Sequence, residues 1–370
     1  MRIDAYNLET RAPDDLHQLR QLLDAGVIRA GEVIAVIGKT EGNGGRNDFT
    51  RALAMSALEH LFAPRLGLAP ERVQDRIIFS FSGGTEGVVT PHMIVFTRTD
   101  EPLAPRSSPA REKRLAIAVG HTRAFHPEEI GRLPQIQETA ALVRHLAASL
   151  DLDDLRDVHL VQMKGAIPRF TAEQAANADH AGRPLRCDMV GSRAASALGV
   201  ALALGEVQPD QLSDDVVGRD FALYSAVASC SAKPGLDRTE IVLFANSPAW
   251  GGDLVIDHEV LQDLLDVAAI RRVAARLGLD RPLTDPRSSP LIAAFAKSEA
   301  DPRGQIRGRR HTMLSDDDIS DTRYSRCVLA SVLAATLGDT RVYVSTRAEH
   351  HGPLGGGPLA LIARVGQGSP

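Results

Sequence analysis

Apolar residues along the chain follow two patterns, which predict strands and helices in alternation. Val33–Ile37 is a continuous β-branched run, and Leu115–Gly120 is a second apolar run of similar length. Runs this short favour buried strands. Asp14–Leu23 instead carries apolar residues at intervals of three and four, which predicts a helix that ends near Gly26. This alternation indicates a mixed α/β fold.

The order of the predicted elements repeats three times, in units 1–103, 112–249 and 254–370. Each unit runs through a strand, a helix, a strand ending at Lys, a helix carrying Arg, a strand leading to Ser, and a final strand. The three sets are Lys39, Arg51 and Ser82; Lys164, Arg193 and Ser231; and Lys297, Arg323 and Ser345. Arg326 lies one helical turn beyond Arg323 and is the alternative arginine in the third unit.

Three segments carry more specific expectations. The apolar run Phe221–Val227 is interpreted as the end of a buried strand, and the small residues Ala228–Ala232 as the turn that follows it. Such a turn would let a hydroxyl and backbone N–H groups reach a ligand together. Val260–Leu277 is predicted to be helical. The basic, proline-rich stretch Pro102–Arg114 is interpreted as a solvated linker between the first two units.

Composition excludes several classes of function. The chain has 370 residues, with 42 basic and 47 acidic side chains and a net charge of −5, so a nucleic-acid footprint is not expected. No apolar run reaches the roughly 18 residues of a membrane span, and the N-terminus has no secretory pattern. The three cysteines are far apart, which favours reduced thiols and a cytoplasmic protein over disulfides or a zinc site.

A threefold arrangement of the units around one axis would bring the three Lys–Arg–Ser sets to a central site. Such a site is rich in donors and positive charge, and it suits a small, flat ring that carries many acceptors. A Ser beside a Lys is also a nucleophile–base pair. Burial and neighbouring cations would lower the lysine pKa toward useful basicity, and backbone N–H groups could hold the oxyanion. This chemistry needs no cofactor.

Simpler interpretations exist for each residue alone. A serine after a strand is usually part of a turn, and a lysine or arginine at an element's end is usually solvated; the threefold coincidence is what favours a shared site. A non-catalytic protein that binds a ring is the alternative from another class. A Ser-Lys hydrolase of the β-lactamase type is disfavoured, because its Ser-x-x-Lys motif occupies one helical turn.

Several motifs resemble the cyclic amide hydrolases, the family of cyanuric acid hydrolases and barbiturases, along essentially the whole chain. They are Gly38-Lys39-Thr40-Glu41-Gly42-Asn43-Gly44, Ser82-Gly83-Gly84-Thr85-Glu86-Gly87, Ala228-Ser229-Cys230-Ser231 and Ala348-Glu349-His350-His351-Gly352-Pro353. The resemblance implies three α/β units around a pseudo-threefold axis with a central active site. It also implies hydrolytic opening of a cyclic amide or imide, with a barbiturase or another, carboxylated cyclic ureide specificity as the alternative.

The resemblance implies specific roles as well. Ser231 would be the nucleophile and Lys164 its base, in a reaction that passes through an acyl-enzyme. The implied substrate-binding residues are Lys39, Arg51, Ser82, Gly83, Arg193, Ala232, Lys297, Arg323, Ser345 and Thr346. A structural divalent ion, usually Mg²⁺, is implied near the C-terminal loop, and a homotetramer would fit the family. Its implied ligands are Glu299, Ala348, His351, Gly352, Pro353 and Gly356, mostly through backbone carbonyls.

The sequence departs from the family pattern after two of the serines. Ser231 is followed by Ala232 and Lys233, and Ser345 by Thr346 and Arg347, where the family has small residues and glycines. The added positive charge leads to the hypothesis that Lys233 or Arg347 pairs with an anionic substituent on the substrate ring.

Overall fold

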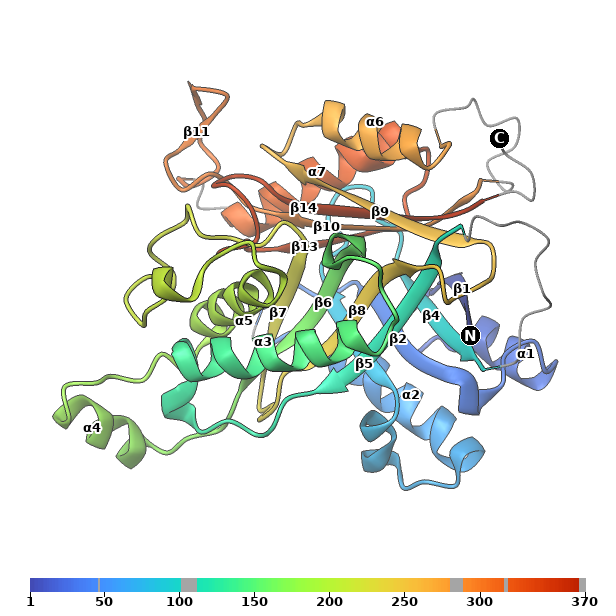
Figure 1. Cartoon of the computed structure of the whole chain (residues 1–370), viewed down its shortest axis with the longest axis horizontal. Helices are drawn as coiled ribbons and strands as arrows, with labels where there is room; N and C mark the ends of the chain where they lie inside the picture. The colour runs from blue at the N-terminus through green and yellow to red at the C-terminus, as the bar shows by residue number, and fades with distance from the viewer. Residues whose placement is uncertain (46, 101–111, 280–288, 316–318, 366–370) are drawn as a thin grey trace.

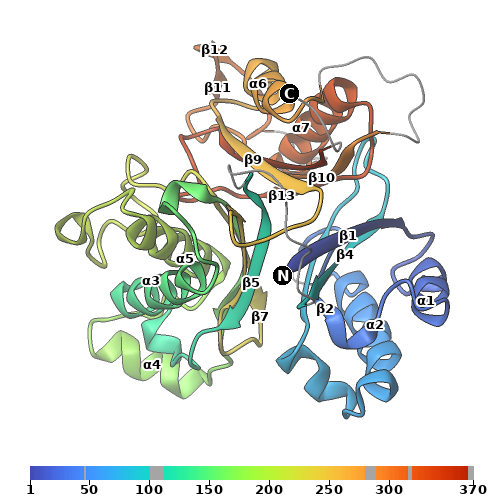
Figure 2. The same ribbon diagram turned by 45° about the vertical axis from the view of Figure 1, so that its right-hand side comes forward.

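The computed structural model describes the chain except residues 46, 101–111, 280–288, 316–318 and 366–370. Three lobes lie around a common centre, and each lobe is one of the repeated units (Figures 1 and 2). The predicted linker lies mostly outside the described residues. None of the helices that the structure describes combines the length and apolarity needed to span a membrane.

Each unit contains one four-stranded sheet, and the three sheets have the same topology. The strand order is first, last, second, third in every unit, and the second and third strands are parallel to each other. This identity confirms the predicted repeat. The strands are β1 Arg2–Glu9, β2 Val33–Thr40, β3 Ile78–Gly83 and β4 His92–Thr99; β5 Arg114–His121, β6 Val158–Ile167, β7 Ala228–Pro234 and β8 Glu240–Ser247; and β9 Leu254–Leu261, β10 Leu291–Ser298, β13 Val342–Thr346 and β14 Gly357–Arg364.

The helices lie on the outer faces of the sheets (Figure 2). The long helix before the serine strand ends in each unit at a glycine with positive φ: Gly67, Gly205 and Gly338 at 65°, 76° and 74°. Glycine adopts this left-handed cap without a Cβ clash. The helices are α1 His17–Asp24, α2 Thr50–Leu66, α3 Leu133–Ala148, α4 Ala172–His180, α5 Met189–Leu204, α6 Val267–Arg276 and α7 Asp321–Leu337, and a small hairpin pairs β11 Gln305–Ile306 with β12 Arg309–Arg310.

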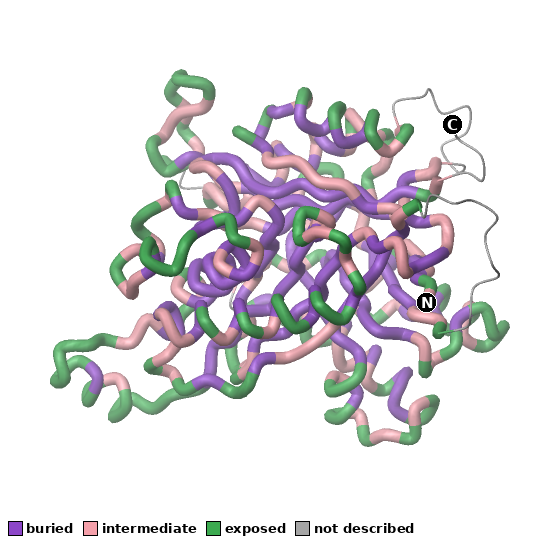
Figure 3. The backbone as a smooth tube through the Cα atoms, viewed as in Figure 1, coloured by how far each residue is buried: buried purple, intermediate pink, exposed green. Residues whose placement is uncertain are grey.

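The largest hydrophobic cluster is shared by all three units and fills the centre (Figure 3). The first strands of the units meet there, and their residues Ile3, Leu115 and Leu254 are each 1% exposed. Phe96 of β4 and Phe244 of β8 pack edge to face, with ring centroids 5.2 Å apart. Burial of apolar surface between units therefore holds the three sheets together.

Two segment predictions are wrong. Phe221–Val227 is irregular, and the small residues after it form β7 rather than a turn, so Ser231 lies inside a strand. Small side chains suit this strand because Ala228 and Cys230 are fully buried beneath its neighbours. Val260–Leu277 is not one helix: β9 continues to Leu261, and α6 begins only at Val267, where Asp266 caps it through its side chain.

Candidate active site

Strand register places each lysine directly opposite the serine of its own unit. In the parallel pairs, Lys39 faces Ser82, Lys164 faces Ser231 and Lys297 faces Ser345. The three pairs come from three equivalent positions, which the predicted order Lys-strand, Arg-helix, Ser-strand requires. The structure therefore brings together the Lys and Ser residues that the sequence pattern singles out.

The lysines close a ring between the units. Each ammonium nitrogen donates to the backbone carbonyl of the residue that precedes the serine of another unit. Lys39 Nζ donates to Val344 O at 2.9 Å, Lys164 Nζ to Phe81 O at 2.5 Å, and Lys297 Nζ to Cys230 O at 2.5 Å. Each lysine thereby connects its own sheet to a neighbouring serine strand, and the contacts run in one direction around the pseudo-threefold axis.

The second Lys–Ser pair is the tightest of the three. Lys164 Nζ lies 2.6 Å from Ser231 Oγ, whereas the other two Nζ–Oγ distances are 3.3 and 3.5 Å. Ser231 is also partly exposed, while Ser82 and Ser345 are buried. A nucleophile must be reachable by its substrate and hydrogen-bonded to its base, and this pair meets both conditions best.

Burial lowers the pKa of all three lysines. It brings the pKa of Lys164 to about 7, with the charges of Arg51 and Lys233 adding to the effect. The pKa of Lys297 falls to about 8 through burial and then the charge of Arg193, and that of Lys39 falls well below its usual value through burial and then Arg326. A lysine with a pKa near 7 is half neutral at neutral pH and can act as a general base.

Lys164 has a second neighbour, which sequence reasoning missed. Glu240 of β8 faces Lys164 in the antiparallel register, and it is 2% exposed. Its Oε2 atom is buried without a hydrogen-bond partner among the described residues. Burial raises the pKa of Glu240, and its negative charge raises that of Lys164. Position 240 follows the serine strand without any motif, so no sequence signal marked it.

Two of the arginines are held by carboxylates of a neighbouring unit. Arg193 donates to both oxygens of Glu349 at 2.8 and 2.7 Å, and Arg326 donates to Glu86, at 2.6 Å from Nε. Each glutamate lies four residues after its unit's serine, and this shared spacing is the signal that could have identified the pairs. Such bidentate contacts fix the guanidinium planes.

The third-unit position equivalent to Arg193 is thus occupied by Arg326 rather than Arg323. The Arg326 side chain is 3% exposed, whereas that of Arg323 is 41% exposed and lies 3.7 Å from Glu86. In the first unit, Arg51 has no such partner, because the residue four positions after Ser231 is Gly235. Arg51 instead donates to Gly45 O at 2.6 Å and pairs with Asp48 at 3.5 Å.

The backbone next to the serines is closely packed. Gly83 O accepts from Lys39 at 3.1 Å, and Thr346 O accepts from Lys297 at 3.2 Å. Ala232 is 1% exposed. A Cβ atom on Gly83 would lie 1.7 Å from Asp48 Oδ2, so glycine is required at this position.

The two added cations after the serines are engaged elsewhere. Arg347 pairs with Asp321 at the start of α7 at 2.8 Å, and its side chain is 42% exposed. Lys233 donates to Gln74 across the contact between the first two units, at 3.2 Å. A hollow beside this contact is lined by Gln74, Lys233, Arg238 and Glu240, among others.

The residues of the implied ion site lie around a tightly packed loop in the third unit. A Cβ on Gly356 would lie 2.0 Å from Leu261 O, which excludes a plain flexible loop. Burial, and then the charge of Glu349, raises the pKa of Glu299 to about 7. No Lys or Arg among the described residues forms an ion pair with this carboxyl, so a cation would relieve its buried charge. A carboxylate with backbone carbonyls of Ala348, Gly352 and Pro353 is a donor set that fits Mg²⁺.

The side chain of His351 is not free for such an ion. Its Nε2 atom accepts the N–H of Cys230 at 2.9 Å, and its Nδ1 atom donates to Glu349 O at 2.6 Å. Only its backbone carbonyl remains as a ligand. The ring instead ties the C-terminal loop to the residue directly before Ser231.

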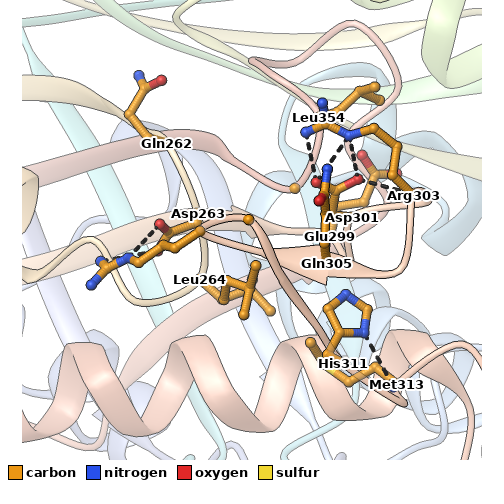
Figure 4. A pocket seen from close by; sticks show the side chains of 14 residues that line it. Gln262, Asp263, Leu264, Glu299, Asp301, Arg303, Gln305, His311, Met313 and Leu354 are labelled. Carbon is orange, nitrogen blue, oxygen red and sulfur yellow. Dashed lines mark hydrogen bonds and ion pairs between the residues drawn. The ribbon is translucent and has the colours of Figure 1, made fainter.

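A hollow lies beside this loop, between Gln262–Leu264, Glu299 and the segment 301–313 (Figure 4). Figure 4 shows Asp301 paired with Arg303, and His311 bonded to the backbone of Met313. Ser231 and Lys164 are not among the described residues that line it. The hollow therefore borders the loop of the implied ion and not the Lys–Ser ring.

Comparison with known proteins agrees with this geometry. A family model described as amidohydrolase ring-opening protein matches residues 4–364. A cyanuric acid amidohydrolase of Enterobacter cloacae is 46% identical over 375 residues, covering 99% of this chain and 100% of the relative. A cyclic amide hydrolase of Azorhizobium caulinodans is 41% identical over 373 residues, covering 99% of this chain and 100% of the relative.

Solved structures agree as well. A cyanuric acid hydrolase described as an innovation by structural concatenation superposes with a TM-score of 0.89 at 41% identity, covering 98% of this chain and 99% of that one. The cyanuric acid hydrolase from A. caulinodans gives a TM-score of 0.85 at 39% identity, covering 99% of both chains. The chain therefore belongs to the family of ring-opening amidohydrolases.

Proposed function

We propose that this enzyme opens the ring of cyanuric acid by hydrolysing one ring C–N bond, with Ser231 as nucleophile and Lys164 as base. The observation that carries the proposal is the 2.6 Å contact between Lys164 Nζ and the partly exposed Ser231 Oγ. The relatives named for cyanuric acid support the choice of substrate. The threefold ring of donors also suits a ring that repeats the same carbonyl and N–H groups three times.

The reaction follows from the positions of these two side chains. Neutral Lys164 takes the proton of Ser231, and Oγ attacks a ring carbonyl carbon. The C–O bond forms, the ring C–N bond breaks, and the departing nitrogen receives the proton from Lys164. Water, deprotonated by Lys164, then attacks the acyl carbon and releases the ring-opened acid from Ser231. Two short steps thus replace one difficult hydrolysis.

The remaining members of the ring would bind and orient the substrate. We assign this role to Arg51, Arg193, Arg326, Ser82, Ser345, Lys39 and Lys297, with backbone groups of Gly83, Ala232 and Thr346. Bound Mg²⁺ would supply a fixed charge that holds the C-terminal loop in place, and Glu299 with carbonyls of that loop would hold it. The chemistry proceeds through protein side chains alone.

An unsubstituted ring is favoured over a carboxylated one. The two cations that could pair with a carboxylate are already engaged, Arg347 by Asp321 and Lys233 by Gln74. We further propose a cytoplasmic homotetramer. Its three cysteines, Cys187, Cys230 and Cys327, are free thiols, which supports a reducing compartment. Light scattering of the purified protein measures the number of chains in the assembly.

The substrate and the acyl-enzyme are tested together. Cyanuric acid, barbituric acid and orotate are each mixed with the parent enzyme and with Ser231→Ala, and loss of ring absorbance is followed. We expect turnover of cyanuric acid by the parent only. Acid-quenched parent enzyme should carry one added substrate on the peptide that contains Ser231. Turnover of barbituric acid alone would change the substrate assignment, and equal turnover by Ser231→Ala would refute the mechanism.

A further inference from the structure

A second cluster of chemically active side chains lies far from the Lys–Ser ring. His159 is near the start of β6, and Asp257 and His258 are on β9, so the cluster joins the second and third units. One ligand atom from each residue lies within 4.8 Å of the others. His159 precedes Lys164 by five residues along β6, a distance of about 17 Å. The cluster is therefore separate from the proposed chemistry.

The two imidazoles face each other through the same atom. The Nδ1 atoms of His159 and His258 are 2.8 Å apart, and the rings meet edge to face with centroids 5.0 Å apart. Asp257 Oδ1 lies 3.6 Å from His159 Nδ1. One ring must donate and the other accept in such a contact, so the pair shares one proton that a cation could displace.

The Asp257 carboxylate is oriented toward this pair by its neighbours. Arg276 Nε holds Oδ2 at 2.5 Å, and Oδ1 accepts the backbone N–H of His258 at 2.7 Å. Glu259 pairs with the same Arg276 at 2.7 Å and offsets its charge. Oδ1 thus keeps a lone pair for a ligand, while the rest of the carboxylate is fixed, as is typical of groups that support metal ligands.

The corresponding contact elsewhere in the molecule contains no imidazole. The residues five before the other two lysines are Ile34 and Ile292. Where the first unit meets the third, Asn7 donates only to the backbone carbonyl of Ile292, at 2.9 Å. The paired imidazoles and the carboxylate are therefore an addition at one of three equivalent contacts, not a requirement for joining units.

We propose that His159, Asp257 and His258 form a binding site for one divalent d-block cation such as Zn²⁺, which clamps the second unit to the third. Zinc–nitrogen bonds of about 2.0–2.1 Å in a tetrahedral site need ligand atoms about 3.3 Å apart. The two Nδ1 atoms must separate by about 0.5 Å and Oδ1 must approach by about 0.3 Å, which small side-chain rotations supply. Water completes the fourth position. Two imidazoles select this class of cation over Mg²⁺.

The test uses full-length protein without an affinity tag, stripped with chelator and titrated with Zn²⁺ or Co²⁺. We expect one Zn²⁺ per chain that survives dialysis, a rise in Tm with Zn²⁺ but not with Mg²⁺, and the visible spectrum of four-coordinate Co²⁺. His258→Ala should abolish all three. Asp257→Asn, a change that keeps the side-chain shape, should weaken Zn²⁺ binding at least about tenfold.

Glu299→Gln is the matched control, because it alters the oxygen-rich loop and leaves the imidazoles intact; it should keep the Zn²⁺ stoichiometry. The proposal is overturned if the stripped parent takes up no Zn²⁺, or if His258→Ala and Asp257→Asn bind Zn²⁺ as the parent does. Loss of the bound ion in Glu299→Gln alone would likewise move the site to the C-terminal loop. None of these readouts depends on the ring-opening activity.

Discussion

Replacing Lys233 by Gln removes a positive charge beside Lys164 and should move the acid limb of the activity profile to higher pH. Burial and neighbouring cations bring the pKa of Lys164 from its usual 10.5 to about 7. At about 1.4 kcal/mol per pKa unit, this difference corresponds to about 5 kcal/mol. It raises the neutral fraction of Lys164 at pH 7 roughly a thousandfold, to about half. Activity should therefore rise through pH 7 as Lys164 loses its proton.

The share of Lys233 in this effect can be estimated from the strand register. Lys233 lies two residues beyond Ser231, so it is a diagonal neighbour of Lys164 at roughly 8 Å. Two unit charges at this distance repel by about 0.5 kcal/mol in water and about 2 kcal/mol at an effective dielectric constant of about 20. Removing the charge should raise the pKa of Lys164 by roughly 0.4 to 1.5 units.

Glu240→Gln is the matched variant of opposite sign. The Glu240 carboxylate raises the pKa of Lys164, so its removal should move the acid limb to lower pH. The shift should be smaller than that of Lys233→Gln, because burial raises the pKa of Glu240 and reduces its ionised fraction. The assay is kcat/KM for ring opening between pH 5 and 9. Shifts in the same direction, or none in either variant, would refute Lys164 as the titrating base.

Further variants test the assignments around the ring. Arg326→Ala should raise KM for cyanuric acid at least about tenfold, because it removes a substrate contact and leaves Glu86 unpaired, whereas the exposed Arg323→Ala should change KM less than about twofold; steady-state kinetics on both decide between them. His351→Ala should lower the free energy of unfolding by about 1–3 kcal/mol, since the buried N–H of Cys230 loses its acceptor. His351→Gln, which can accept the same bond, should lose less in urea denaturation, and equal losses would contradict this role.

The repeat and the Lys–Ser pairs could be predicted from the sequence because they depend on local patterns. A lysine that ends one apolar strand and a serine in the next face each other whenever the two strands are parallel neighbours, as in all three units. β7 was missed because its small residues have low strand propensity, and pairing with β6 imposes the strand.

The partners of the site could not be predicted, because they come from other units. Arg326 and Arg323 are both one turn from the same helix face, and only Glu86, 240 residues earlier in the chain, distinguishes them. The paired imidazoles of His159 and His258 are 99 residues apart, and each is a single histidine in its own strand. Contacts of this kind appear only when the three units assemble.

The most direct test compares Ser82→Ala, Ser231→Ala and Ser345→Ala in cyanuric acid turnover. The three serines occupy equivalent positions, and each faces a lysine. If Ser231 alone is the nucleophile, its replacement should lower kcat at least about a thousandfold, while the other two variants should mainly raise KM. Retained turnover in Ser231→Ala, or an equal loss of kcat in Ser82→Ala or Ser345→Ala, would contradict the assignment of chemistry to the second unit.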